Sequence, residues 1–339
     1  MTNLIIGKIN SGKTRGILFN EFKKSIANKE NLFILDEKEE YYKTFKKELD
    51  DNGYKVYVLN LKDTSKSNSF NPLMVPYNYY KNGNIDKAIE SITELGLEIF
   101  KTDNSNIDPF WENSAADYFT ALTLILFKEA SIKEINLGSI QTMITLGSRN
   151  IEDTFVIKKY FNNLDINDII YKSGSSVVYA PMETRESIIS VMKQKLNTYC
   201  LREQLLNNLC GNDIDLMNIE SKAAIFVINK LGLNNISNIM INQLVNTNIE
   251  MTYYLDNLDN MPLILELKNM LDSKLKVYVA TRNKEEFVSK YGKTIIDCFE
   301  NIVENKEVTE YNEIGSCNEY PIFKKNEVEY FNIEEYIKN

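Results

Sequence analysis

The sequence predicts an α/β fold in which a mainly parallel sheet, flanked by helices, is interrupted along the chain by an all-helical domain. Three observations lead to this prediction. Residues 7–14 match the phosphate-binding pattern G-x-x-x-x-G-K-[ST]. Strand-like and helix-like segments alternate in residues 1–75 and again in 213–305, as in parallel α/β folds. Between these regions, residues 76–212 have helical periodicity almost throughout.

Residues 7–14 lie in the setting that a phosphate-binding loop requires. The apolar run 4–6 before them is typical of a buried strand, and residues 14–24 continue as a helix. The backbone N–H groups of such a loop face an anion, Lys13 reaches the β- and γ-phosphates, and the Thr14 hydroxyl ligates magnesium. We therefore predict ATP and Mg²⁺ as cofactors, with a chance glycine-lysine turn as the alternative. The predicted nucleotide-binding residues are Gly7, Lys8, Ile9, Asn10, Ser11, Gly12, Lys13, Thr14 and Arg15, although solvated surface charge is an equal alternative for Lys8 and Arg15.

Two more strands are expected in the first region. Residues 31–35 form an apolar run that ends in Asp36, a charged helix follows over 39–51, and residues 55–61 alternate as a third strand. Parallel sheets present their ligand-binding loops at the carboxyl ends of the strands. The phosphate-binding loop and Asp36 are therefore expected at the same edge.

The middle of the chain is expected to be helical. Its one ambiguous, strand-like stretch is residues 175–179. Trp111, with Phe110 and Phe119, is predicted to pack in the core of this domain rather than to stack on a nucleic-acid base. The expected helices cover residues 85–100, 111–130, 137–146, 151–161 and 184–206.

Strand character returns at residues 223–228, 251–255 and 275–280. The second of these strands ends in Asp256, where a nucleotide hydrolase carries the acid that holds the magnesium ion. We therefore predict Thr14 and Asp256 as metal-binding residues. The alternatives are that Asp256 only caps the next helix or that Asp259 has this role.

The expected domains follow from these patterns. A length of 339 residues corresponds to roughly two domains. The end of the chain, rich in Glu, Asn and Tyr, is either a partner-recruiting segment or a peripheral element packed on the sheet domain. The predicted divisions are a nucleotide-binding domain over 1–75 and 213–305, an all-helical domain over 76–212, and a C-terminal extension over 306–339.

Composition excludes several function classes. The four cysteines lack C-x-x-C spacing and histidine is absent, which argues against a zinc site or a histidine-dependent triad. The formal net charge of −9 argues against nucleic-acid binding through the overall field, though not against a local basic channel. No apolar run is long enough for a membrane span, and the first strand begins next to Met1. We therefore expect a cytoplasmic protein without an integral membrane span.

The order of these motifs resembles the TraG/TraD-type conjugative coupling proteins of type IV secretion systems, which belong to the HerA/FtsK group of P-loop ATPases. The resemblance extends from residue 1 to about residue 305. Besides the loop, the matching positions are Asp36, Lys38 and Glu40 of a D-x-K-x-E pattern, Asn71 to Leu73, Asp108 to Trp111, and Tyr291-Gly292.

The resemblance implies a RecA-like ATPase domain with an all-helical insertion. It further implies a homo-hexamer that binds ATP between subunits and delivers single-stranded DNA or a relaxase–DNA complex to components of a secretion channel. Such partners would bring the protein to the inner face of the cell membrane. A nucleotide-binding adaptor descended from such a motor is the main alternative, and a small-molecule P-loop kinase is disfavoured because the chain has few arginines.

The chain departs from the family pattern at three catalytic positions, one of which is an arginine upstream of the last strand with no counterpart near residues 271–276. The family has a glutamate after the metal-binding aspartate that acts as a base toward the attacking water, whereas this chain has Asn257, whose amide cannot accept that proton. The family's γ-phosphate-sensing glutamine is matched here by Arg282. Asp259 or Glu266 is a candidate replacement base, and hydrolysis is expected to be slow without one. The predicted catalytic residues are Lys13, Asp256, Asn257 and Arg282.

Overall fold

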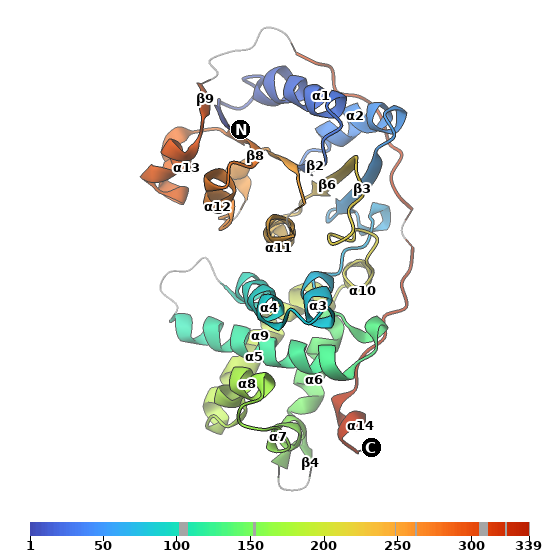
Figure 1. Ribbon diagram of the computed structural model, residues 1–339, viewed down its shortest axis with the longest axis vertical. Helices are drawn as coiled ribbons and strands as arrows, with labels where there is room; N and C mark the ends of the chain where they lie inside the picture. Colours follow the sequence, from blue (N-terminus) through green and yellow to red (C-terminus); the bar gives the residue numbers. More distant parts are fainter. Residues whose placement is uncertain are drawn as a thin grey trace. The chain divides into compact units, whose positions relative to one another are not determined.

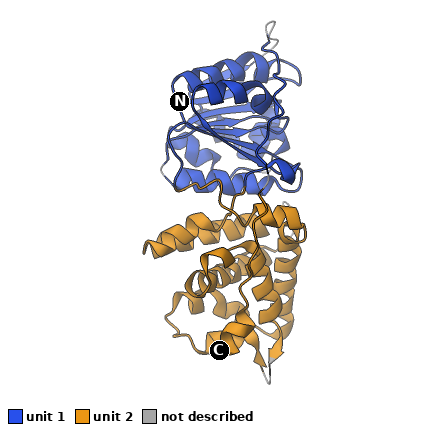
Figure 2. Ribbon diagram, turned by 90° about the vertical axis from the view of Figure 1, so that its right-hand side faces the viewer, with its two compact units in different colours: residues 1–68, 218–323 blue, residues 69–217, 324–339 orange. Residues whose placement is uncertain are grey.

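The computed structural model describes residues 1–101, 108–151, 154–247, 249–261, 263–304, 311–322 and 324–338. The chain divides into two compact units, residues 1–68 with 218–323 and residues 69–217 with 324–339, which Figure 2 shows in blue and orange. Residues 69–75, expected in the sheet region, group with the second unit. One reason is that the buried Asn71 side chain donates to the carbonyl oxygen of Ile135, 2.7 Å away.

The first unit contains a seven-stranded sheet with the order β3-β6-β2-β7-β8-β1-β9, and every neighbouring pair is parallel. The predicted mainly parallel sheet is therefore confirmed. The edge strand β9 was not expected, because all four of its residues are exposed and carry no pattern of burial. The strands are β1 (Thr2–Ile6), β2 (Leu32–Leu35), β3 (Lys55–Asn60), β6 (Ala223–Ile228), β7 (Thr252–Leu255), β8 (Lys276–Thr281) and β9 (Asn301–Glu304).

Helices cover both faces of this sheet. Figure 1 shows α1 and α2 on one face and α11 and α12 on the other. The helices of the first unit are η1 (Lys13–Leu18, with π-type hydrogen bonds), α1 (Phe19–Ala27), α2 (Glu40–Asp51), η2 (Thr64–Lys66), α11 (Asn234–Asn246), η4 (Leu258–Asn260), α12 (Leu267–Asp272), α13 (Lys284–Tyr291) and η5 (Lys293–Cys298).

An aromatic core joins α1 and α2 to the sheet. Phe22 of α1 packs edge-on against Tyr254 of β7, with ring centroids 5.0 Å apart, and against Tyr41 of α2 at 5.4 Å. These rings are buried and form one apolar cluster with Phe19 and Phe45. Aromatic pairs in such orientations stabilise a core beyond their area of contact. The helix that follows the phosphate-binding loop is therefore held firmly on the sheet.

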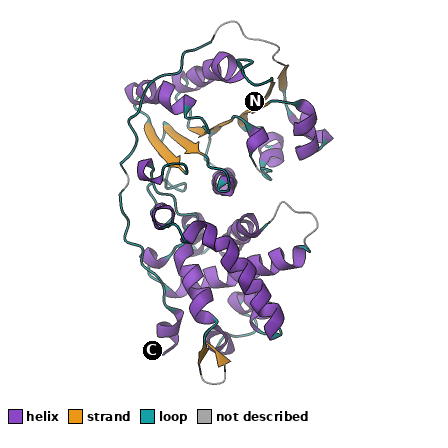
Figure 3. Cartoon of the chain, turned by 180° about the vertical axis from the view of Figure 1, so that it is seen from behind, coloured by secondary structure: helices purple, strands orange, loops and turns teal. Residues whose placement is uncertain are grey.

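In its described residues, the second unit is built of helices apart from a two-stranded antiparallel sheet of β4 (Asn150–Ile151) and β5 (Thr154–Phe155), visible in Figure 3. The expected all-helical insertion is thus not confirmed, and the helix expected from residue 151 begins at Val156. The helices are α3 (Met74–Lys81), α4 (Ile85–Phe100), α5 (Pro109–Glu129), η3 (Ile132–Glu134), α6 (Leu137–Gly147), α7 (Val156–Asn162), α8 (Ile169–Val178), α9 (Met182–Cys200), α10 (Glu203–Asn208) and α14 (Ile333–Lys338).

The long helix α5 forms much of the core of this unit. Phe119 is fully buried and packs edge-on against Phe100, as expected of a core residue. Phe110 is instead 48% exposed and contacts the ring of Trp111, so the expected core packing does not hold for it. The ambiguous residues 175–179 lie in or next to α8 and form no strand. In the described part of the chain, no helix combines the length and apolar character of a membrane span.

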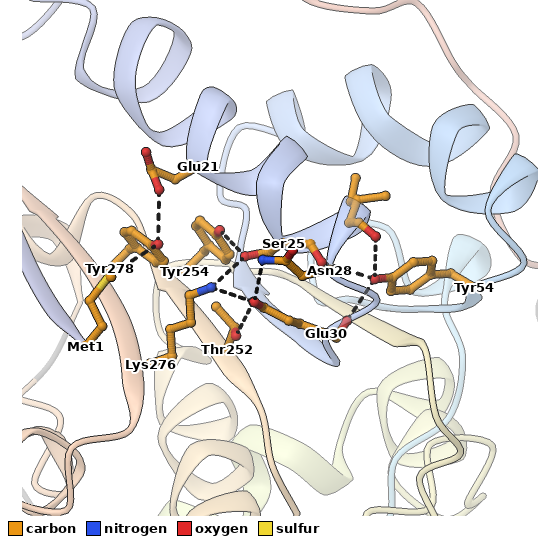
Figure 4. Close-up of polar contacts among 11 residues, drawn as sticks. Met1, Glu21, Ser25, Asn28, Glu30, Tyr54, Thr252, Tyr254, Lys276 and Tyr278 are labelled. Atoms are coloured by element: carbon orange, nitrogen blue, oxygen red, sulfur yellow. Dashed lines mark hydrogen bonds and ion pairs between the residues drawn. The ribbon is translucent and has the colours of Figure 1, made fainter.

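A polar cluster fixes the C-terminal end of α1 to β7 and β8 (Figure 4). The Glu30 carboxylate accepts hydrogen bonds from Lys276 Nζ at 2.6 and 2.8 Å and from Thr252 Oγ1 at 2.8 Å. Ser25 Oγ lies 2.9 Å from the hydroxyl of Tyr254. Burial raises the pKa of Glu30, but these hydrogen bonds outweigh burial and leave the pKa below its usual value.

Replacing Glu30 with glutamine is expected to lower the free energy of unfolding at pH 7 by roughly 1.5–3 kcal/mol, the contribution of hydrogen bonds to a charged group. Because the pKa of Glu30 is depressed on folding, its contribution is present above the unfolded pKa and is lost as the pH falls through the folded pKa. Urea unfolding of wild type and Glu30→Gln at several pH values measures this. The difference between the proteins must shrink toward acid, and a constant difference would show that the Glu30 charge does not contribute.

Candidate nucleotide-binding site

The phosphate-binding loop connects the end of β1 to η1. Gly7 N donates to the carbonyl oxygen of Thr281 on β8 at 3.1 Å, which attaches the start of the loop to the sheet. Asn10 and Gly12 have positive φ angles of 63° and 84°. Glycine adopts this left-handed conformation without strain, and asparagine tolerates it better than most residues. The backbone can therefore curl at the N-terminal end of η1, where unpaired N–H groups favour an anion.

Lys13 is the buried cation of this loop. It is only 6% exposed, and its Nζ lies 3.5 Å from the carbonyl oxygen of Lys8. Burial lowers the pKa of Lys13, while the nearby charges of Asp256 and Asp259 act in the opposite direction. A buried ammonium group of this kind is costly unless an anion compensates it. The loop therefore presents a positive charge that fits a phosphate group.

Thr14 and Asp256 meet beside this loop. Thr14 Oγ1 donates to Asp256 Oδ2 at 2.7 Å, although the residues are 242 positions apart in sequence. Asp256, at the end of β7, is 6% exposed, and burial raises its pKa against the hydrogen bond from Thr14 and the charge of Lys13. A hydroxyl and a carboxylate are ligands that Mg²⁺ accepts. Among the described residues, no cluster of three or more His, Cys, Asp or Glu could hold a metal ion.

An open pocket of about 200 Å³ lies over the loop. Of the predicted nucleotide-binding residues, Gly7 and Lys8 do not line this pocket, and the side chain of Lys8 is exposed. Asp256 lines a smaller adjoining pocket that also includes Asp36. The lining residues of the larger pocket are Ile9, Asn10, Ser11, Gly12, Lys13, Thr14, Arg15, Lys38, Glu40, Asn257 and Arg282.

Asn257 follows Asp256 and lines both pockets. Its backbone N–H donates to Asp256 Oδ1 at 2.8 Å and thereby orients the carboxylate that was predicted to bind the metal. Its φ of 59° lies in the left-handed region, where asparagine is better tolerated than glutamate. Asparagine therefore fits the backbone at this position, even though its amide cannot act as a base.

Arg282 follows β8 and is held at the pocket by Asp259. The Asp259 carboxylate accepts hydrogen bonds from Arg282 N at 3.0 Å and Thr281 Oγ1 at 2.6 Å, and pairs with Arg282 Nε at 3.7 Å. Arg282 Nη2 also donates to Asn260 Oδ1 at 3.3 Å. Asp259 is thus a partner of Arg282 and does not line the pocket as a base would. Glu266 accepts hydrogen bonds from the side-chain amides of Asn242 and Asn269 and does not line the pocket either.

Sequence reasoning assigned no chemical role to the turn between β2 and α2. Asp36 is buried and accepts the backbone N–H groups of Tyr41 and Tyr42, at 3.3 and 2.8 Å, so it caps α2. Burial raises the pKa of Asp36 to about 7. Lys38 and Glu40 line the pocket. The sequence signal that could have placed Lys38 and Glu40 at the pocket was their position after a parallel strand, because the carboxyl ends of β2, β7 and β1 meet at one edge of the sheet.

The C-terminal segment 311–322 also contacts this site. Arg15 Nε donates to the carbonyl oxygen of Asn312 at 2.8 Å, and Asn312 Nδ2 donates back to the Arg15 carbonyl oxygen at 2.7 Å. Tyr320 stacks on Tyr42 of α2, with ring centroids 4.7 Å apart. A Cβ at Gly315 would meet the Lys43 carbonyl oxygen at 2.3 Å, so only glycine fits this close approach. This part of the extension packs on the sheet unit, which was one of the two expected alternatives.

The parallel sheet, the loop at residues 7–14 and the Thr14–Asp256 pair define the class of P-loop nucleotide-binding proteins. The chain belongs to the family described as type IV secretory system conjugative DNA transfer proteins, which matches residues 3–273. This finding confirms the resemblance to TraG/TraD-type coupling proteins.

Solved structures of the plasmid coupling protein TrwB share the fold. An unbound form of the bacterial conjugative coupling protein TrwBdeltaN70 has a TM-score of 0.58 and 10% identity, covering 89% of this chain and 67% of that one. TrwB in complex with ADP and Mg²⁺ has a TM-score of 0.57 and 10% identity, covering 89% and 69%. TrwB with the ATP analogue ADPNP has a TM-score of 0.54 and 11% identity, with the same coverage. No curated protein sequence matches the chain significantly.

Proposed function

We propose that this protein is an ATP-dependent motor subunit of a conjugative type IV secretion system, which couples ATP binding and hydrolysis to the delivery of DNA or a relaxase–DNA complex. The observation that carries the proposal is the 2.7 Å contact between Thr14 and Asp256 beside a phosphate-binding loop, in a chain of the conjugative DNA transfer family. The bound ADP, Mg²⁺ and ADPNP of the TrwB structures support ATP and Mg²⁺ as the ligands.

Each side chain at the pocket has a role in this proposal. The loop N–H groups and Lys13 bind the β- and γ-phosphates, and Thr14 and Asp256 hold Mg²⁺, which supplies positive charge to the phosphate oxygens when bound. Arg282, fixed by Asp259, faces the same pocket and stabilises negative charge that develops on the transferred group. The arrangement suits phosphoanhydride hydrolysis because positioning and charge stabilisation are the main requirements of phosphoryl transfer.

The assembly belongs to the same proposal. The assembly that fits the family is a homo-hexamer that binds ATP between its subunits. It contacts secretion-channel components and reaches the inner face of the cell membrane through them. The support for this assembly is the chain's membership of the conjugative DNA transfer family.

DNA-stimulated ATP turnover is the experiment that tests the motor function. Steady-state turnover, measured with and without single-stranded DNA at protein concentrations that permit assembly, is expected to rise several-fold when DNA is added. Lys13→Ala is the control for contaminating ATPases and should remain at background with and without DNA. ATP binding without DNA-dependent turnover would contradict the motor and indicate a nucleotide-binding adaptor.

A further inference from the structure

Glu40 is the one acidic side chain, within the described part of the chain, that lines the pocket over the phosphate-binding loop. It also lines the smaller adjoining pocket, together with Thr14 and Asp256. Its position therefore connects the space over the loop with the metal-binding pair. Asn257, which takes the place of the family's catalytic glutamate, lines both pockets as well.

The turn that carries Glu40 is rigidly built. Glu40 is the first residue of α2, and the preceding residue, Glu39, has a left-handed backbone with φ 61°. Buried Asp36 fixes the first turn through the N–H groups of Tyr41 and Tyr42, whose rings pack in the aromatic core. β2 lies next to β7 in the sheet, so this turn is held beside Asp256 by the strand order itself.

The carboxylates near the loop differ in the hydrogen bonds that their oxygens accept. Asp256 accepts from Thr14 and from the N–H of Asn257, and Asp259 accepts from Thr281 and Arg282. Within the described residues, the Glu40 carboxylate has no hydrogen bond or ion pair, and only its backbone oxygen accepts, from Thr44. An acceptor that is not engaged by the protein is available to a water molecule in the pocket.

We propose that Glu40 is the general base for ATP hydrolysis in this protein and replaces the glutamate that position 257 lacks. Its carboxylate accepts a proton from water as the water oxygen bonds to the γ-phosphorus. The bond from that phosphorus to the β–γ bridging oxygen breaks, its electron pair remains on ADP, and inorganic phosphate leaves. Glu40 then releases the proton to solvent. This inference rests on the proposed ATPase function, but it concerns only the origin of the base.

A purely structural role for Glu40 predicts a different outcome. An acidic residue in the first turn of a helix stabilises the helix by typically 0.3–1 kcal/mol, and a loss of this size would leave turnover per folded molecule unchanged. Glu39 offers a matched control because it lies in the same turn, does not line the pocket, and is engaged by Lys43 at 3.4 Å and by the Tyr320 hydroxyl.

The experiment compares full-length wild type, Glu40→Gln and Glu39→Gln. Turnover is measured with Mg-ATP and single-stranded DNA, binding is measured with a non-hydrolysable ATP analogue, and circular dichroism reports folding. Glu40→Gln is expected to lower kcat by ~10²–10⁴-fold, the usual contribution of a positioned base, with analogue affinity within about threefold of wild type. Glu39→Gln should stay within about threefold in both measurements.

The possible outcomes separate the two proposals. If wild type hydrolyses ATP and Glu40→Gln has a similar kcat, the proposed role of Glu40 is overturned and the proposed ATPase function stands. Equal losses of analogue affinity and turnover in Glu40→Gln would show that Glu40 supports the binding site and is not a base. Wild type that binds the analogue but has no turnover above that of Lys13→Ala would overturn both the ATPase and its proposed base.

Discussion

Changing Lys13 to alanine is expected to weaken Mg-ATP binding at least ~10-fold, which corresponds to about 1.4 kcal/mol. The loop holds this ammonium group at 6% exposure, and its hydrogen-bonding partner is a carbonyl oxygen at the long distance of 3.5 Å. Its charge is therefore available for the β- and γ-phosphates. Isothermal titration calorimetry of the two proteins measures the difference.

The stability of the same variant separates a binding defect from a folding defect. Burial lowers the pKa of Lys13, so the charged side chain does not favour the folded state. Lys13→Ala is therefore expected to unfold at the same or a higher denaturant concentration than wild type. Lys24→Ala, which removes an exposed lysine of α1 paired with Glu21, is the control and should bind Mg-ATP like wild type. Unchanged affinity in Lys13→Ala would refute the assignment of the loop.

Local sequence signals were sufficient for the parts of the site that lie in a continuous segment. The loop at residues 7–14 could be identified because its glycine and lysine spacing, between an apolar run and a helix, has few other physical explanations. Asp256 could be placed because the apolar strand β7 ends there. Its contact with Thr14 follows from the parallel sheet, which brings the carboxyl ends of its strands to one edge.

The parts that sequence reasoning missed depend on contacts between distant segments. Glu40 was noted only as part of a D-x-K-x-E pattern, and its place in the pocket depends on the pairing of β2 with β7, which the sequence does not specify. Asn312 bonds to Arg15 across 297 positions, and its segment has neither helical nor strand periodicity. Similarly, β9 could not be predicted because its residues are exposed and its hydrogen bonds go to β1.

The assignment of Asp259 changed for the same reason. From sequence it was a candidate base, since it is an acid just after the metal-binding aspartate. In the structure its carboxylate accepts hydrogen bonds at the end of β8, from the Thr281 hydroxyl and the backbone N–H of Arg282. A carboxylate that accepts this many hydrogen bonds is better suited to holding Arg282 than to accepting a proton from water.

Introducing a carboxylate at position 257 provides the strongest test of where the base lies. Asn257→Glu in the wild-type background is expected to change turnover little, because Glu40 already acts as the base. In the Glu40→Gln background, the same change is expected to raise turnover at least ~10-fold, since position 257 lines the same pocket and a base contributes mainly in the transition state. Steady-state turnover of the four proteins measures both effects.

The backbone at position 257 limits how complete this rescue can be. With φ 59°, glutamate is expected to lower the free energy of unfolding by roughly 1 kcal/mol in either background, because asparagine tolerates the left-handed conformation better. Asn257→Gln is the matched control, since it imposes the same strain without a carboxylate and should rescue nothing. If Asn257→Glu instead raised turnover strongly in the wild-type background, and by the same factor in the Glu40→Gln background, the native protein would lack a base. The native protein would then hydrolyse ATP slowly, as the sequence predicts from Asn257.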